Sequence, residues 1–379
     1  MQKKLIALAV AGLMSAPAFA QSNVTIYGVV DYGYSWTGDS ALSGVNSRSA
    51  IDSGISAGNR LGFKGTEDLG NGLKAGFVYE MGFGNGSEHA SGTLAAGAAG
   101  NRQALVSLSG AFGTIALGRQ YTPAHVMLAG NIDPFGFGKG TVAAISNVYI
   151  SPPRLDNLAA YASPSWGGFS FVTAYTNNAA GDETRANGSG SGLTAGTDAR
   201  AWAFAPTYKN GPIYAALNIH QIRGNATTAG NDSVTKAWDL GGTYDFGVVK
   251  LGAVYGITDA EDYAKHKQWA LTAAVPVGAA GKIQATYVRR KTEVDQAGVS
   301  DAKVSLWGLG YEYALSKRTA IYTAYADINN KGSAKDGGNW AGYLGDATRN
   351  YAATGNTGTS NTASGAYERG FNVGIRHSF

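Results

Sequence analysis

The feature that most restricts the fold of this chain is a rhythm of about sixteen segments, each ~9–13 residues long, joined alternately by short turns and long polar loops. Apolar and polar residues alternate within the segments, as in VTIYGVVDYGYSW at 24–36. Strands of soluble proteins are typically about 5–6 residues long, whereas a tilted membrane strand needs roughly 9–11. Lipid requires every backbone polar group to be paired internally, which a closed barrel achieves. The rhythm therefore predicts an all-β fold, a transmembrane antiparallel β-barrel of about sixteen strands.

The connections differ systematically in length. Short turns are expected at 70–72, 111–113, 167–168, 210–211, 278–281 and 317–318, and long polar loops at 38–58, 84–101, 178–198, 224–235 and 330–366. A secreted β-sandwich is the competing architecture, but it would have shorter strands and no such asymmetry. The asymmetry favours the barrel, in which turns lie at one end and loops at the other.

The N-terminus has the parts of a secretory signal peptide. Lys3 and Lys4 precede a short apolar run, which ends at a small-x-small cleavage site at 18–20. The run is well short of the ~20 residues of a spanning helix, which argues against a retained anchor. We expect residues 1–20 to be cleaved and the barrel domain 21–379 to be exported, with the net charge falling from +4 to +2. That balance gives no support to nucleic-acid binding, and the absence of cysteine excludes disulfides and thiolate sites.

From Tyr121 to Asp156 the two-residue alternation of apolar and polar residues is absent. Loops this long are uncommon in compact domains and are usually functional or disordered. This one is too apolar for easy disorder, since it contains Met127, Leu128, Ile132, Phe135, Phe137, Val142, Ile145, Val148, Tyr149 and Ile150. We expect residues from about 122 to 156 to pack inside the barrel, where irregular backbone is tolerated because it lines a cavity.

The chain ends on a strand pattern, YERGFNVGIRHSF, whose aromatic last residue, Phe379, resembles the assembly signal of bacterial outer-membrane barrels. The phrases NRLGFKGTEDLGNGLKAGFVYE, RQALVSLSGAFGTIALGRQYTP and RLDNLAAYASPSWGGFSF resemble the general trimeric porins of Gram-negative bacteria, in the beta-proteobacterial branch that includes the neisserial porins. The resemblance covers the whole mature chain. It implies an outer-membrane homotrimer surrounded by lipid and lipopolysaccharide, with the third long loop folded into the lumen as a constriction.

A barrel of about sixteen strands is wide enough for an aqueous channel, so fixed charges at its narrowest point bias which ions enter. Strand parity places Arg60, Lys64 and Glu80 on the water-facing side. For Arg102 the alternation is ambiguous, and its place in the lumen, like that of Arg154, is implied by the resemblance. We interpret the four basic residues as a basic wall of the constriction and Glu80 as part of its acidic side. The alternative is that they are solvated lumen charges away from the eyelet.

The loop itself carries little negative charge. Asp133 is the only acid between Tyr121 and Pro153, and Lys139 stands near a position where a second acid could be expected. Enteric porins of this family carry an acidic motif at the tip. The tip, DPFGFGK, departs from their Pro-Glu-Phe-Gly-Gly type of motif. With Asp133 on the acidic side and Lys139 opposing it, the constriction is predicted to be positive on balance and to prefer anions.

One arginine is expected to point the other way. Arg119 shares the parity of Ile115 and Leu117, which places it on the outer face. In related porins the corresponding arginine meets the second long loop of a neighbouring subunit, which makes Glu88 a candidate trimer contact. The alternative is an unpaired surface arginine.

Two other classes of function, catalysis and substrate-specific transport, have less support in the sequence. The five histidines form no nucleophile or metal-binding arrangement, and GSGSG at 188–192 lacks the strand-to-helix context of a phosphate-binding loop. We therefore expect no catalysis, no cofactor and no metal. The closer alternative to a general diffusion pore for ions and small hydrophilic solutes is a sugar- or anion-specific channel of the same fold. Phe135, Phe137 and Tyr149 could begin an aromatic slide, but they could equally hold the loop against the wall.

Overall fold

The computed structural model describes residues 23–40, 47–83, 102–137, 141–179, 199–224, 233–261, 264–294, 301–331 and 367–379. Most of these residues lie in one antiparallel sheet of 17 strands. The first eight strands are β1 (Asn23–Ser40), β2 (Arg48–Ser53), β3 (Arg60–Gly70), β4 (Leu73–Gly82), β5 (Gln103–Gly110), β6 (Gly113–Tyr121), β7 (Arg154–Ala162) and β8 (Phe169–Thr176). They are followed by β9 (Ala199–Asn210), β10 (Ile213–Gly224), β11 (Ser233–Asp245), β12 (Lys250–Ala260), β13 (Ala264–Val277), β14 (Gly281–Val294), β15 (Ala302–Ala314), β16 (Thr319–Lys331) and β17 (Tyr367–Ser378).

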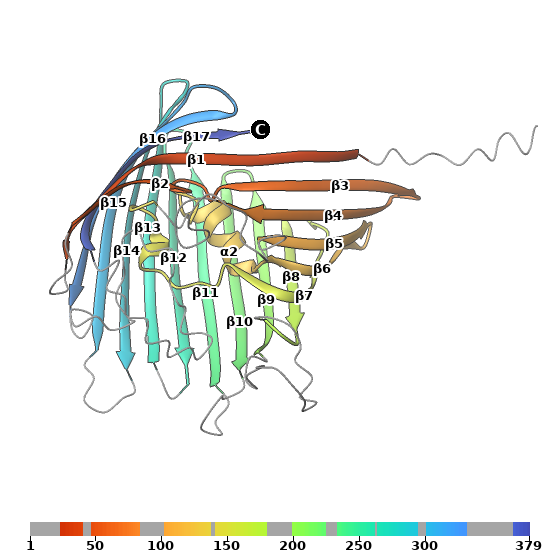
Figure 1. Cartoon of the computed structure of the whole chain (residues 1–379). Coiled ribbons are helices and arrows are strands. Elements are labelled where there is room, and N and C mark those ends of the chain that lie inside the picture. Colours follow the sequence, from red (N-terminus) through yellow and green to blue (C-terminus); the bar gives the residue numbers. More distant parts are fainter. Residues whose placement is uncertain are drawn as a thin grey trace, which may run out of the picture.

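The sheet closes because its first and last strands pair with each other. β1 pairs with β17 along most of its length. On its other edge, β1 pairs with β3 through residues 23–29 and with β2 through residues 32–37, so β2 and β3 share one position in the ring. The 17 strands therefore make a closed antiparallel barrel with sixteen positions, as the sequence predicts. Figure 1 shows the strands curving into one continuous wall.

Side chains alternate between the two faces of this wall. One face exposes a belt of large apolar residues, including Leu117, Leu240 and Leu271, each more than half exposed. On the opposite face of β13, which carries Leu271, the side chains of Gln268 and Thr272 are buried. In a membrane barrel the apolar belt faces lipid and the other parity faces the lumen. Two-residue periodicity thus accounts for both the fold and its membrane setting.

The two ends of the barrel differ, as expected from the connection lengths. Short hairpins join alternate strand pairs at one end. The first is the turn between β3 and β4, in which Asn71 and Gly72 both have positive φ, 51° and 78°, as a type I′ hairpin requires. At the other end, the expected polar loop at 38–58 proves shorter, because β1 runs to Ser40 and β2 lies inside it. Polar residues hid this strand from sequence reasoning.

Between β6 and β7 the chain leaves the sheet for its longest described excursion. The loop contains α2 (Pro123–Met127), a π-helical turn η1 (Leu128–Ile132) and a 3₁₀ turn η2 (Ile145–Asn147). Thr122 caps α2 by accepting a hydrogen bond from the His125 N–H at 3.1 Å. β7 begins at Arg154, so the loop ends at Pro153, slightly before the expected boundary. No helix among the described residues is long and apolar enough to cross a bilayer.

The main hydrophobic core lies between this loop and the wall. Loop and wall residues form one buried cluster: Met127, Leu128, Ile132, Phe137, Val142, Ala143, Ile145, Val148 and Tyr149 from the loop, with Ala216, Val254, Ala270, Val288, Val304, Leu306, Ala324, Ala326 and Ile328 from β10 and β12–β16. The wall residues belong to the parity opposite the exposed belt. The apolar composition of the loop is therefore explained by packing against the wall.

Candidate functional site

A charged network gathers on the wall beside the start of this loop. Glu80 of β4 is almost fully buried and is its centre. Its carboxylate accepts a hydrogen bond from Arg102 Nε at 2.8 Å and one from the Tyr27 hydroxyl at 3.0 Å. Arg60 Nε lies 3.8 Å from the same carboxylate. Buried charges persist when they are paired and hydrogen-bonded, which is the case for Glu80 and Arg102.

Tyr121, the last residue of β6, extends the network to a third arginine. Its hydroxyl oxygen accepts hydrogen bonds from Arg102 and Arg154, each at 2.9 Å. The Arg154 guanidinium also lies 4.5 Å from the Tyr121 ring centroid, a cation–π distance. The His125 ring of α2 stacks on Tyr121 with centroids 4.7 Å apart. Tyr121 therefore couples the arginines to the helical start of the loop.

The network carries an excess of positive charge. It contains three guanidinium groups, of Arg60, Arg102 and Arg154, and the single carboxylate of Glu80. Lys64 lies next to it, with its Nζ 5.1 Å from the Tyr27 ring centroid. Charges this close have overlapping fields within the ~8 Å screening length of physiological salt. The sequence-predicted basic wall is thus brought together in space, and the tyrosines that link it were not anticipated.

Asp133 organises the loop from within. Its side chain is 4 % exposed and accepts hydrogen bonds from the backbone N–H groups of Phe135 and Phe137, each at 3.0 Å, and of Ile145 at 3.1 Å. Phe135 and Phe137 belong to the loop tip, whereas Ile145 follows it. The Asp133 carboxylate therefore holds loop backbone in place, and its predicted position on the acidic side of the constriction stays a prediction.

Asp133 makes loop packing depend on pH. Burial raises the pKa of Asp133 from 3.8 to about 7, against the opposing effect of the three N–H donors. A carboxyl whose pKa is higher when packed binds its proton more tightly there, so its stabilising contribution is fully present below pH ~4 and is lost as pH rises through about 7. We expect amide hydrogen exchange at Phe135, Phe137 and Ile145, corrected for intrinsic pH effects, to show greater protection at pH 5.5 than at pH 8.5.

The matched controls are two neutral replacements. Asp133→Asn should remove this pH dependence because the amide does not titrate. Asp245→Asn should retain it, since Asp245 caps only the exposed turn at Gly247. Equal protection of the wild type at both pH values would contradict the linkage.

The wall holds the loop through side chains from several strands. Gln268 of β13 donates to the Ile150 carbonyl at 3.0 Å and accepts from its N–H at 2.8 Å. Arg290 of β14 donates to the Val148 carbonyl at 2.7 Å. Further bonds run from Thr272 to Ile132, from Thr286 to Ala143, from Gln284 to Pro134 and from Tyr149 to Asp239. These bonds satisfy irregular backbone that would otherwise be buried without partners.

Two wall glycines allow this close approach. A Cβ added at Gly308 of β15 would lie 2.5 Å from the Ala143 Cβ. One added at Gly256 of β12 would lie 2.3 Å from the Tyr149 hydroxyl. Both distances are far below normal contact, so the loop fits only where the wall lacks side chains.

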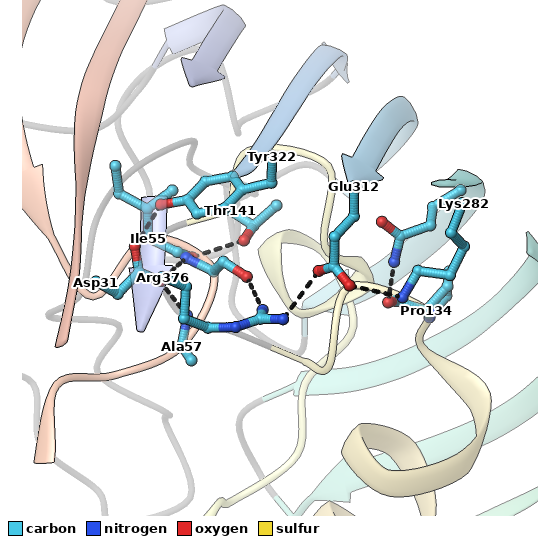
Figure 2. Close-up of polar contacts among 11 residues, drawn as sticks. Asp31, Ile55, Ala57, Pro134, Thr141, Lys282, Glu312, Tyr322 and Arg376 are labelled. Carbon is cyan, nitrogen blue, oxygen red and sulfur yellow. Dashed lines mark hydrogen bonds and ion pairs between the residues drawn. The ribbon is translucent and has the colours of Figure 1, made fainter. Parts of the chain in front are cut away.

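A second polar cluster holds the connection between β2 and β3 on the same face (Figure 2). Asp31 of β1 accepts hydrogen bonds from the N–H groups of Ser56 and Ala57 at 2.7 and 2.6 Å, and from the Tyr322 hydroxyl. The Ile55 carbonyl in this connection accepts from Thr141 of the loop at 2.6 Å. The loop is therefore held on two sides, by the wall strands and by this connection.

Beside it, charged groups of three strands form a chain across the wall. Arg376 of β17 donates to Ser56 and, at 3.1 Å, to Glu312 of β15. Glu312 also lies 3.3 Å from Lys282 Nζ of β14. Figure 2 shows the three side chains in line, next to Pro134 of the loop. Two cations and one carboxylate again leave a positive excess near the loop.

Comparison with known proteins identifies the family of this chain. Residues 7–333 match the family model described as Gram-negative porin. The chain belongs to the Gram-negative porin family. This porin is 35% identical to Outer membrane porin protein 32 of Delftia acidovorans over 394 aligned residues, covering 100% of each chain. It is 30% identical to an outer membrane porin protein of Bordetella pertussis, with 85% of this chain and 93% of that protein covered.

Solved structures agree in fold. An anion-selective porin from Comamonas acidovorans superposes on this porin with a TM-score of 0.72 and 27% identity, covering 95% of this chain and 100% of that one. The in-vitro folded trimer form of OmpT from Vibrio cholerae has a TM-score of 0.64 at 15% identity and covers 94% of this chain. The expected fold, the beta-proteobacterial porin family and the outer-membrane location are confirmed.

The remaining site residues have different outcomes in this porin. Lys139 and Glu88 lie outside the described residues, as do the cleavage site and residues 1–22. Arg119 forms an ion pair with Asp156 of its own chain, while its proposed trimer contact stays a prediction. Phe379 exchanges backbone hydrogen bonds with Gly28, each at 3.1 Å, which places the C-terminus in the barrel ladder. Its part in assembly also stays a prediction.

Proposed function

We propose that this porin is an anion-preferring general diffusion pore for ions and small hydrophilic solutes. The observation that carries this is the network around Glu80, in which three arginines outnumber one carboxylate. We further propose that the loop from Thr122 to Pro153 narrows the lumen and that its first turns bring the permeation path alongside these arginines. A few fixed charges at a narrow point bias ion entry because their fields are incompletely screened there.

The selectivity of a relative supports the sign of this preference. The anion-selective porin from Comamonas acidovorans shares the fold at 27% identity. A homotrimer in contact with outer-membrane lipid and lipopolysaccharide, formed after cleavage of residues 1–20, is part of the same proposal. Its support is the family and the trimer form among the structural neighbours. Catalysis and cofactors form no part of it.

A substrate-specific sugar channel is less well supported by the packing of the loop aromatics. Phe137 and Tyr149 are 4 % and 1 % exposed. Tyr149 also directs its hydroxyl to Asp239 at 2.7 Å. Side chains used in this way hold the loop on the wall and leave little surface for a sugar to stack on.

A bilayer measurement tests the proposal. In a KCl gradient we expect the wild-type reversal potential to report anion preference, and a conductance that rises linearly with salt. Lys139→Glu should weaken the preference, because it replaces a positive charge in the loop tip by a negative one. Clear cation selectivity of the wild type would overturn the anion assignment, and saturable block by a single solute would favour a specific channel.

A further inference from the structure

A row of lysines crosses the lipid-facing side of the wall. Lys267 of β13 stands directly opposite Lys291 of β14, which stands directly opposite Lys303 of β15. Like charges in directly opposed positions destabilise a sheet. Glu293 relieves part of this repulsion, since its carboxylate lies 2.7 Å from Lys267 Nζ and 3.0 Å from Lys291 Nζ. The row as a whole remains positive and favours an external anion.

Two cations of this region have no acidic partner among the described residues. Lys303 is exposed and stands opposite Lys331 of β16 in the strand register, and the acids nearby, Glu293 and Asp301, pair with Lys267 and Lys291 instead. Arg289 is exposed two residues before Lys291 and is flanked by Trp269 and Ser305 across the strands. An arginine on a face that otherwise meets lipid is costly unless an anion compensates it.

The depth of these residues is set by neighbouring aromatic pairs. Trp238–Tyr255, Trp269–Tyr287 and Trp307–Tyr325 lie side by side on the outward face of β11–β16, with ring centroids 5.3–5.5 Å apart. Aromatic girdles of this kind lie at the level of lipid headgroups. Arg289 lies in the same row as Trp269, and the lysine row lies one step further toward the end with the long loops. Long loops are extracellular in outer-membrane barrels, so the cations lie at the depth of the outer-leaflet headgroups.

We propose that Lys267, Arg289, Lys291 and Lys303 form a basic patch that binds the phosphate groups of a phosphorylated glycolipid in the outer leaflet. Arginine offers a planar fork for phosphate oxygens, and lysine offers a compact positive charge. The patch accommodates acyl chains below it, where Leu271 and Leu309 continue the apolar belt. This inference rests on the proposed contact with outer-membrane lipid and specifies its place; it is independent of ion selectivity.

The test compares two double variants that remove the same charges. Arg289→Gln with Lys303→Gln removes the two patch cations that have no described acidic partner. Lys317→Gln with Arg318→Gln removes one lysine and one arginine from the exposed turn between β15 and β16, at the opposite end of the barrel. Binding of bisphosphorylated lipid A to the full-length, detergent-solubilised protein is measured by native mass spectrometry. We expect the patch variant to bind at least about tenfold more weakly than the wild type, and the turn variant to bind like the wild type.

Four further readouts keep the proposal falsifiable, two on the wild-type protein and two on the patch variant. Wild-type protein should bind dephosphorylated lipid A much more weakly than the bisphosphorylated form, and equal binding would overturn the proposal. Competition by millimolar inorganic phosphate would assign the patch to free anions, and subunit dissociation in the patch variant would assign it to a subunit interface. The reversal potential of the patch variant should match that of the wild type, so a failure of anion selectivity would leave the lipid result unaffected.

Discussion

Replacing Arg60 and Arg154 together by glutamine will reduce the anion preference of this porin on the order of tenfold in the anion-to-cation permeability ratio. The two changes remove the positive excess of the network and leave Arg102 to balance Glu80. Because Arg102 keeps its 2.8 Å bond to Glu80, no buried charge loses its closest partner. The barrel should therefore fold, and the change should appear in the reversal potential across a KCl gradient.

Arg289→Gln is the matched control for this experiment. It removes one guanidinium from the lipid-facing side of the same barrel, where lipid and protein separate it from the permeation path. Its reversal potential should equal that of the wild type. An equal shift in both variants, or none in the double variant, would show that the network does not set selectivity.

Excising residues 134–144 and joining Asp133 to Ile145 through two glycines will widen the pore. The ends can be joined because the Asp133 carboxylate already lies 3.1 Å from the Ile145 N–H. We expect the single-channel conductance to rise roughly twofold, because the excised segment includes the Pro134 and Ala143 carbonyls through which Gln284 and Thr286 hold the loop on the wall. Larger neutral solutes should also enter, as measured by liposome swelling.

Thr141→Val is the control for loop excision. It removes the hydrogen bond to the Ile55 carbonyl but keeps the loop length and nearly the same side-chain volume. Its conductance should stay close to that of the wild type. An unchanged conductance after excision would show that the loop is not the narrowest part of the path.

The sequence predicted the wall well because strand parity is a local property. Arg60, Lys64 and Glu80 could be assigned to the polar face from alternation alone, and the structure places them there. For Arg102 alternation was ambiguous, because this residue precedes β5, which begins at Gln103, and so need not follow its parity. Its place depends on Glu80, a contact between strands that periodicity does not encode.

The interior of the site was less accessible to sequence reasoning. Tyr27 and Tyr121 link the arginines, yet in the sequence they are two of 21 tyrosines. The burial of Asp133 depends on a turn that returns the chain to Ile145, and no local pattern reports it. The position of the connection between β2 and β3 could not be predicted for the same reason. It depends on bonds from Asp31 to Ser56, Ala57 and Tyr322, which join distant parts of the chain. Strand parity could have placed Tyr27 and Asp31 on the inner face, since both belong to the polar parity of β1.

The pairing of β1 with β17 has a consequence for biogenesis. The first strand finds one of its two partners only when residues 367–378 have been delivered. Until then, any inserted intermediate has two open edges, whose unpaired N–H and C=O groups are intolerable in hydrocarbon. A product truncated before Tyr367 would leave β1 and β16 in that condition permanently. Pairing of β17 with β1 is therefore the step that removes the open edges. Only molecules that include β17 can close the barrel in the membrane.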